Sequence, residues 1–140
     1  MASQFFAVKT FFRSACEGRP ERPDKYFDPE ATLVEERIQL IKAKSPAEAR
    51  KKAEKDAVEY ARRILYKNPY NQQVTLEYMG LCEIYEIQQP LADKTEIYAA
   101  SRIINRKVSK AKIGRTYLNE RQSFDHSRRK KFLNKDHIHE

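Results

Sequence analysis

The chain has 140 residues, 40% of them apolar and 34% charged, which is enough for one hydrophobic core and too few for two ordinary domains. Its formal net charge of +8 comes entirely from the last forty residues, because residues 1–100 hold 16 basic and 16 acidic side chains whereas residues 101–140 hold 12 and 4. The sequence lacks the run of about 18 apolar residues that a membrane span needs and a signal peptide's basic leader, so we expect a cytoplasmic protein.

Two cysteines, Cys16 and Cys82, lie far apart and show no C-x-x-C spacing. This pattern argues against a disulfide framework and against a zinc site, so both are expected as free thiols. Cys82 lies in an apolar run, where a cysteine packs as a small hydrophobic residue.

The first predicted element is a strand over residues 4–13, QFFAVKTFFR. Aromatic and β-branched side chains occupy both parities of this segment, which is typical of a strand buried on much of both faces. The segment Cys16–Ala31 follows, with three prolines and many charges, and predicts a long connecting loop.

Residues 33–44, LVEERIQLIKAK, alternate in polarity and predict a half-buried strand. Because Val34, Ile38 and Leu40 share one parity, we expect these three side chains to face the core. Charged and amide side chains then occupy the opposite, solvated face.

Ser45-Pro46-Ala47-Glu48 is a capping box with proline at the first helical position. It predicts a helix that begins there and continues to about Leu65 or Tyr66. Alanines recur at three- and four-residue steps along this segment, so its apolar stripe is narrow enough to lie close against a sheet.

Residues 74–87 predict a strand in which apolar side chains change parity near Gly80. We expect a bulge or bend at Gly80 that reverses which side chains face the core, bringing Leu81 inward. Residues 95–104, TEIYAASRII, predict a last strand. The fold class is therefore α+β: a four-stranded antiparallel sheet with one covering helix, in the order ββαββ, plus a basic, partly helical C-terminal extension.

The stretches VEERIQLIKAKSPAEARKKAE (34–54) and GLCEIYEIQQPLADKTEIYAASRI (80–103) resemble a family of small bacterial domains of unknown function. A Glu-Glu-Arg strand, a capped helix and a closing Thr-Glu-Ile-Tyr strand carry the resemblance, which covers residues 4–104. It implies the same ββαββ layout and a bacterial source, and it implies no activity. The resulting division is a domain of residues 1–104 and an extension of residues 105–140.

No catalytic motif is recognisable: the chain has three glycines and neither a phosphate-binding loop nor a nucleophile elbow. Glu35 and Glu36 point to opposite faces of a strand and cannot form one carboxylate site. The terminal Asp136–Glu140 segment contains two histidines but matches no zinc spacing. We expect no catalytic residue, no metal and no cofactor.

The extension combines basic and aromatic residues, a composition that suits contact with phosphates and bases and equally suits a solvated or protein-docking tail. A short amphipathic helix is expected between Lys110 and about Phe124. The candidate residues for binding a partner or a nucleic acid are Lys110, Lys112, Arg115, Tyr117, Arg121, Phe124, Arg128, Arg129, Lys130 and Lys131.

Three functions remain open, and the third of them, a nuclease or other enzyme, would require an acidic or histidine cluster that converges only in three dimensions. The first is a non-enzymatic bacterial protein-binding module, such as a regulator or a toxin-neutralising protein, and the second is an accessory protein that binds DNA or RNA through the extension. A protein partner is the favoured expectation, no membrane is expected, and an exposed final strand would permit a homodimer.

Overall fold

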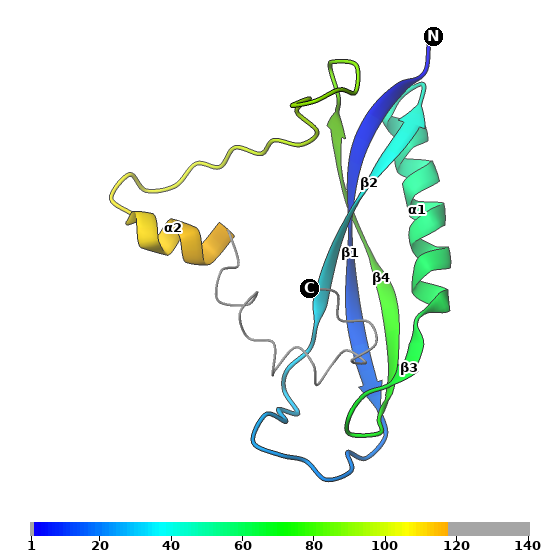
Figure 1. The fold of residues 1–140 in the computed structure, drawn as a ribbon, viewed down its shortest axis with the longest axis vertical. Helices are drawn as coiled ribbons and strands as arrows, with labels where there is room; N and C mark the ends of the chain where they lie inside the picture. The colour runs from blue at the N-terminus through cyan, green and yellow to red at the C-terminus, as the bar shows by residue number, and fades with distance from the viewer. Residues whose placement is uncertain (1, 118–140) are drawn as a thin grey trace.

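The computed structural model describes residues 2–117 and has one twisted antiparallel sheet with a long helix along one face (Figure 1). The strand order is β2-β1-β4-β3. The α+β class and the ββαββ order are therefore confirmed. The elements are β1 (Gln4–Glu17), β2 (Val34–Ala43), α1 (Pro46–Arg63), β3 (Leu65–Lys67), β4 (Gln73–Glu86) and α2 (Lys110–Tyr117).

Strand β1 is the centre of the sheet and pairs with β2 on one side and β4 on the other. Phe6, Val8 and Phe12 are fully buried beneath α1, and Ala7 on the opposite face is 3% exposed. The expectation of a strand buried on both faces is thus confirmed, although β1 continues to Glu17 and is longer than expected.

Helix α1 begins at the predicted cap. The Ser45 hydroxyl accepts a hydrogen bond from the Glu48 backbone N–H at 3.1 Å, with Pro46 in the first turn. The Glu48 carboxylate reaches back as expected, but it accepts from the Lys44 N–H, at 3.3 Å. The helix ends at Arg63 because Ile64 is already extended and leads into β3.

The helix packs on the sheet through four buried alanines, whose small side chains let the two backbones approach closely. One core cluster is centred on Phe6 and Val8, with Cys82 and Ile84 of β4 packed against it. A second cluster surrounds Phe12 and includes Tyr78. The buried alanines are Ala49, Ala53, Ala57 and Ala61.

The predicted irregularity in β4 lies where Gly80 indicated it. Between the pairs Thr10–Cys82 and Phe12–Tyr78, β4 contains three residues where β1 contains one, and Gly80 adopts a φ of +74°. The predicted change of facing is wrong, however. Two extra residues restore the period of two, so Cys82, like Tyr78, faces α1.

The facing predicted for β2 is also wrong. Val34, Ile38 and Leu40 are each 49% exposed and lie on the face that α1 does not cover. Arg37 and its odd-numbered neighbours point toward the helix instead. Helix α1 packs most extensively on β4, so only the end of β2, with Ile41 and Ala43, joins the core beneath it. Along the rest of β2, long polar side chains reach the helix margin, while Val34, Ile38 and Leu40 point away.

The predicted last strand over residues 95–104 is absent, and the short β3, which pairs with the start of β4, is the fourth strand. Instead, Tyr98 places its ring 5.9 Å from that of Tyr85 and donates a hydrogen bond to Glu83 at 2.8 Å. These side-chain contacts hold the segment across the sheet face rather than at its edge. Helix α2 then lies off the side opposite α1 (Figure 1).

Candidate functional site

The predicted binding residues of the extension divide at the end of the described region. Lys110, Lys112, Arg115 and Tyr117 lie on α2 and are all exposed. Within residues 2–117 the three basic side chains form no ion pair, and the Arg102 guanidinium lies 4.9 Å from the centre of the Tyr117 ring. The remaining predicted residues, Arg121, Phe124, Arg128, Arg129, Lys130 and Lys131, lie outside the described residues.

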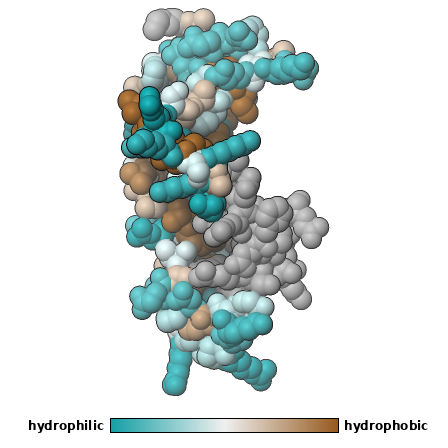
Figure 2. Space-filling model, turned by 90° about the vertical axis from the view of Figure 1, so that its left-hand side faces the viewer, coloured by the Kyte–Doolittle hydropathy of each residue, from teal (hydrophilic) through white to brown (hydrophobic). Residues whose placement is uncertain are grey.

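The sheet face opposite α1, called here the back face, is not covered by that helix. Strand β2 contributes Val34, Ile38 and Leu40 to it, and Lys9 of β1 lies beside Ile38 in the register. Figure 2, which looks onto this side, shows apolar side chains in the middle of the surface among hydrophilic ones. A half-exposed apolar row on a sheet is a feature of surfaces that bind another protein.

A polar cluster crosses the centre of the back face. The Lys9 ammonium lies 3.9 Å from the Glu36 carboxylate and donates a hydrogen bond to the Tyr98 hydroxyl at 3.1 Å. It also lies 4.5 Å from the centre of the Tyr98 ring, and the Tyr98 hydroxyl donates to Glu83. This cluster attaches the segment after β4 to the sheet.

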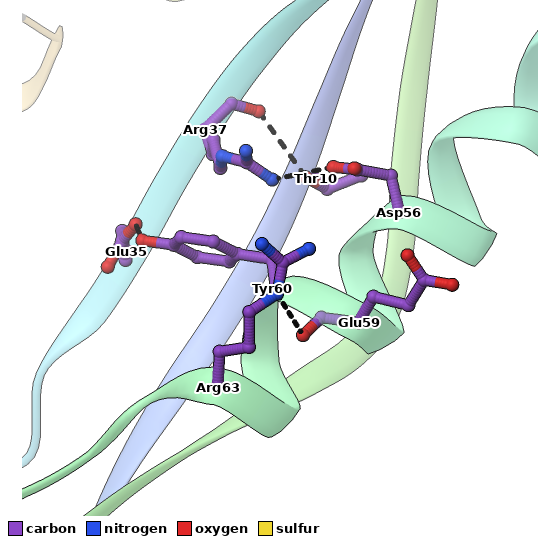
Figure 3. A network of polar contacts seen from close by, with 7 residues as sticks. All are labelled: Thr10, Glu35, Arg37, Asp56, Glu59, Tyr60 and Arg63. Carbon is purple, nitrogen blue, oxygen red and sulfur yellow. Dashed lines mark hydrogen bonds and ion pairs between the residues drawn. The ribbon is translucent and has the colours of Figure 1, made fainter.

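The opposite face of β2 carries a second polar network, which joins the strand to α1 (Figure 3). The Arg37 guanidinium donates to the Asp56 carboxylate at 2.9 Å and stacks 3.9 Å from the Tyr60 ring centre. The Tyr60 hydroxyl donates to Glu35, and burial together with that carboxylate raises the pKa of Tyr60 to about 12. This network holds the odd-numbered residues of β2 toward the helix.

The Glu-Glu-Arg motif therefore has a structural explanation. Glu35 and Arg37 bind side chains of α1, whereas Glu36 points to the back face and pairs with Lys9. The Tyr98 of the closing motif meets the same lysine. These motifs maintain the arrangement of sheet, helix and closing segment, and they assemble no reactive group.

A pocket of about 480 Å³ lies at the far end of the sheet, between β1 and the proline-rich loop. The loop is held to the turn before β4: the Tyr70 hydroxyl donates to Asp24 at 2.7 Å, and the Phe27 ring packs edge-on against Tyr70. In the same turn, the Asn68 side-chain oxygen accepts hydrogen bonds from the backbone N–H groups of Tyr70 and Gln72. The long loop is thus tied to the domain by specific contacts.

Cys16 lines this pocket and is the thiol among its lining residues. Burial raises the pKa of the Cys16 thiol, with a weaker opposing effect from the Asn68 amide, 3.7 Å away. A thiol with a raised pKa is protonated at neutral pH and reacts slowly. The pocket therefore lacks the activated nucleophile that thiol catalysis requires.

No group of histidine, cysteine and carboxylate side chains suited to hold a metal ion occurs in residues 2–117. In the same part of the chain, neither helix has the length and apolar character needed to cross a membrane.

The sequence analysis assigned the back face incorrectly. Alternation in β2 identified the apolar side chains that share a face, but the analysis placed the core on that face instead of on the opposite one.

Comparison with known proteins identifies a family for this chain. A family described as "Domain of unknown function (DUF4288)" matches residues 5–99, which include α1, Tyr98 and the whole sheet apart from Gln4. Neither the curated proteins nor the solved structures gave a match.

Proposed function

The chain belongs to the DUF4288 family, and from the exposed back face we propose that it works as a non-enzymatic, cytoplasmic protein-binding module. The observation that carries the proposal is the row of half-exposed apolar side chains on β2, Val34, Ile38 and Leu40. A regulator or a toxin-neutralising protein is the class of bacterial protein that this surface would suit. Such proteins act by covering a surface of their target.

The chemistry of the back face supports binding of a protein. The β2 row places apolar side chains between Glu36 and Lys42, so a contact there would bury apolar area with charges at its margin. Protein interfaces have this arrangement of an apolar centre and a polar rim. The buried Ala7 and the docked Tyr98 give the face a rigid floor, so little conformational entropy would be lost on binding.

The test compares two aspartate substitutions. Leu40→Asp places a charge beside Ile38 at one end of the apolar row, whereas Val58→Asp places the same charge on the outer side of α1, where Val58 is 45% exposed. Proteins that co-purify with the full-length chain would be identified, purified and titrated against each form by calorimetry. We expect stoichiometric binding that Leu40→Asp weakens at least about tenfold and Val58→Asp leaves unchanged.

Equal effects of the two substitutions would contradict the role of the back face. Failure to find any stoichiometric partner for the folded chain would contradict the proposed function itself. Circular dichroism of each variant provides the control for folding.

A second function, binding of DNA or RNA, is favoured by one observation on α2. Its exposed Lys110, Lys112 and Arg115 have no acidic neighbour within the helix, so they would be available to phosphates. Stacking of Arg102 on Tyr117 provides a flat cation beside an exposed ring, a combination that suits contact with bases.

This second proposal is tested by fluorescence anisotropy with single- and double-stranded DNA and RNA in 50 to 300 mM salt. Binding should fall steeply with salt, and reversal of the three α2 charges to glutamate should flatten that dependence. The matched control reverses Lys51, Lys55 and Arg62, exposed on α1, which changes the net charge equally. Equal losses for both triple variants would indicate nonspecific attraction and would contradict a role for α2.

A further inference from the structure

Strand β2 is an edge of the sheet along its whole length. It pairs with β1 through ten residues, from Val34 to Ala43, and no other strand of residues 2–117 lies on its outer side. An exposed edge of this length presents unpaired backbone N–H and C=O groups that another strand can use. On the other side of the sheet, β3 covers only residues 73–75 of β4. The rest of β4 is also an edge, but it contains the irregularity at Gly80, a feature that protects an edge against pairing.

Proteins usually protect such edges with proline, a bulge or a row of like charges. β2 has neither a proline nor a break in its register with β1. Its back-face charges are one acid near the start, Glu36, and one base near the end, Lys42. Charges of opposite sign at the two ends do not repel a second copy that approaches in the antiparallel direction.

The back-face side chains of β2 are self-complementary in one antiparallel register. When Gln39 lies opposite Gln39 of a second copy, Ile38 faces Leu40 of that copy and Glu36 faces Lys42. The two-fold axis repeats both pairs, giving two apolar contacts and two opposite-charge contacts. Cross-strand pairs of these kinds are the ones that stabilise a sheet.

In the neighbouring registers, Glu36 no longer faces Lys42 and charged side chains face apolar ones instead. Shifting the second strand by two residues in one direction places Glu36 opposite Leu40, and shifting it in the other places Ile38 opposite Lys42. A shift by a single residue is excluded because it would put the back face of one copy against the helix face of the other.

We propose that two copies of the chain pair through β2 in the register centred on Gln39, forming a continuous eight-stranded sheet. This inference rests on the proposed function, since it names a second copy of the chain as the protein that pairs with β2, the strand that carries the apolar row of the back face. It replaces the sequence-based expectation of pairing through a final strand over residues 95–104, because the described residues after β4, up to residue 117, form no strand. The paired back faces would form one surface of twice the width.

One contact has to rearrange at the end of the edge. The Lys52 ammonium of α1 donates to the Lys42 backbone carbonyl at 2.8 Å and to the Glu48 carboxylate at 3.2 Å. Lys52 is exposed and flexible, and its carboxylate partner remains available after the carbonyl is released. The cost of freeing this part of the edge is therefore small.

The first test is a charge swap followed by sedimentation equilibrium of the full-length chain. Glu36→Lys and Lys42→Glu each place like charges opposite one another twice per dimer, and each should raise the dimer Kd about tenfold or more. The double variant Glu36→Lys/Lys42→Glu restores opposite charges in this register alone, so its Kd should return to within about threefold of the original. Thermal unfolding controls for the lost contact between Glu36 and Lys9.

The second test fixes the register by cross-linking. Gln39→Cys places two thiols directly opposite one another, within the Cα separation of about 4.4–6.8 Å that a disulfide spans. In Ile38→Cys the two introduced cysteines are offset by two residues along the paired strands, so their Cα atoms are more than about 7 Å apart, too far for a disulfide. Under mild oxidation Gln39→Cys should give a covalent dimer, whereas Ile38→Cys and the original chain with its own two cysteines should not.

A monomer at concentrations up to about 100 µM, or a dimer cross-linked through Ile38→Cys rather than Gln39→Cys, would overturn the inference. These outcomes are separate from a failure of the proposed function. A monomeric chain that still binds another protein through the back face would retain the function, and a Gln39-linked dimer without any other partner would retain only the dimer.

Discussion

Phe12 lies at the point where the assignment of faces in the sheet can be tested most directly. Its side chain has no exposed surface, and its ring centre lies 5.1 Å from that of Tyr60 and 5.7 Å from that of Tyr78. The neighbouring Phe11 points to the back face and is partly exposed. The same substitution at these two adjacent positions therefore compares the two sides of β1.

Replacing a buried phenylalanine by alanine costs about 3–5 kcal/mol, because transfer free energy is lost and a cavity remains. The whole domain is stable by about 5–15 kcal/mol, so Phe12→Ala removes a large part of its stability. Phe12→Leu keeps most of the side-chain volume but loses the two ring contacts, so it should lower the free energy of unfolding by about 1–2 kcal/mol. Phe11→Ala leaves no enclosed cavity and should cost about 1–2 kcal/mol.

Urea unfolding followed by circular dichroism measures these differences. With an m-value of about 2 kcal/mol/M, Phe12→Ala should lower the midpoint by about 2 M and Phe11→Ala by less than about 1 M. Unchanged m-values would show that the same cooperative unit unfolds. A larger loss for Phe11→Ala than for Phe12→Ala would refute the placement of the core between β1 and α1.

Three further predictions concern local features. Gly80→Ala should destabilise the domain by about 1–2 kcal/mol in the same assay, because its φ of +74° disfavours a side chain although no atom lies within 4 Å of the added Cβ; no loss would contradict the strained bulge. Tyr60 and Tyr66 have pKa values raised to about 12 by burial, so the stability they contribute is complete below about pH 10 and is lost as the pH rises toward 12. Spectrophotometric titration should show their late ionisation, and Tyr60→Phe should remove part of it; ionisation of all tyrosines near pH 10 in the folded chain would contradict it. Cys16 should react with a thiol reagent at pH 7 more slowly than a free cysteine and faster as the pH rises, and equal rates would show that its thiol is not buried.

Local signals in the sequence predicted most of the elements. The Ser45 cap is decided by bonds within four residues, and the bulge near Gly80 depends on a backbone conformation that glycine tolerates. The free state of the two cysteines also followed from their spacing. Such features depend on a few neighbouring residues, so a single sequence contains the information needed to place them.

The candidate site was predicted less well. The sequence analysis favoured the basic extension, of which α2 lies in the described part of the chain, and assigned the apolar residues of β2 to the core. Alternation identifies side chains that share a face, but it does not say which face the helix covers. Here Ile41 and Ala43 pack in the core beneath α1, and the ion pair from Arg37 to Asp56 and the hydrogen bond from Tyr60 to Glu35 hold the same face of β2 toward the helix.

The last predicted strand failed for a related reason. Residues 95–104 have the composition of a strand, yet the Tyr98 hydroxyl accepts a hydrogen bond from Lys9 and donates one to Glu83, and these contacts hold the segment on the back face. The three residues of β3 are too few to give a periodic signal of their own, and their pairing with β4 depends on where α1 ends.

By itself, the sequence determined the helix and its cap, the three long strands, the bulge position and the concentration of positive charge in the last forty residues. The charge is a count of residues, and the other features follow from interactions between residues that are close along the chain. Only the tertiary structure decided which face of β2 is exposed, where the closing segment docks and which strand forms the free edge. These depend on contacts between segments far apart in the sequence, whose free energies compare whole arrangements of the sheet and helix rather than local preferences.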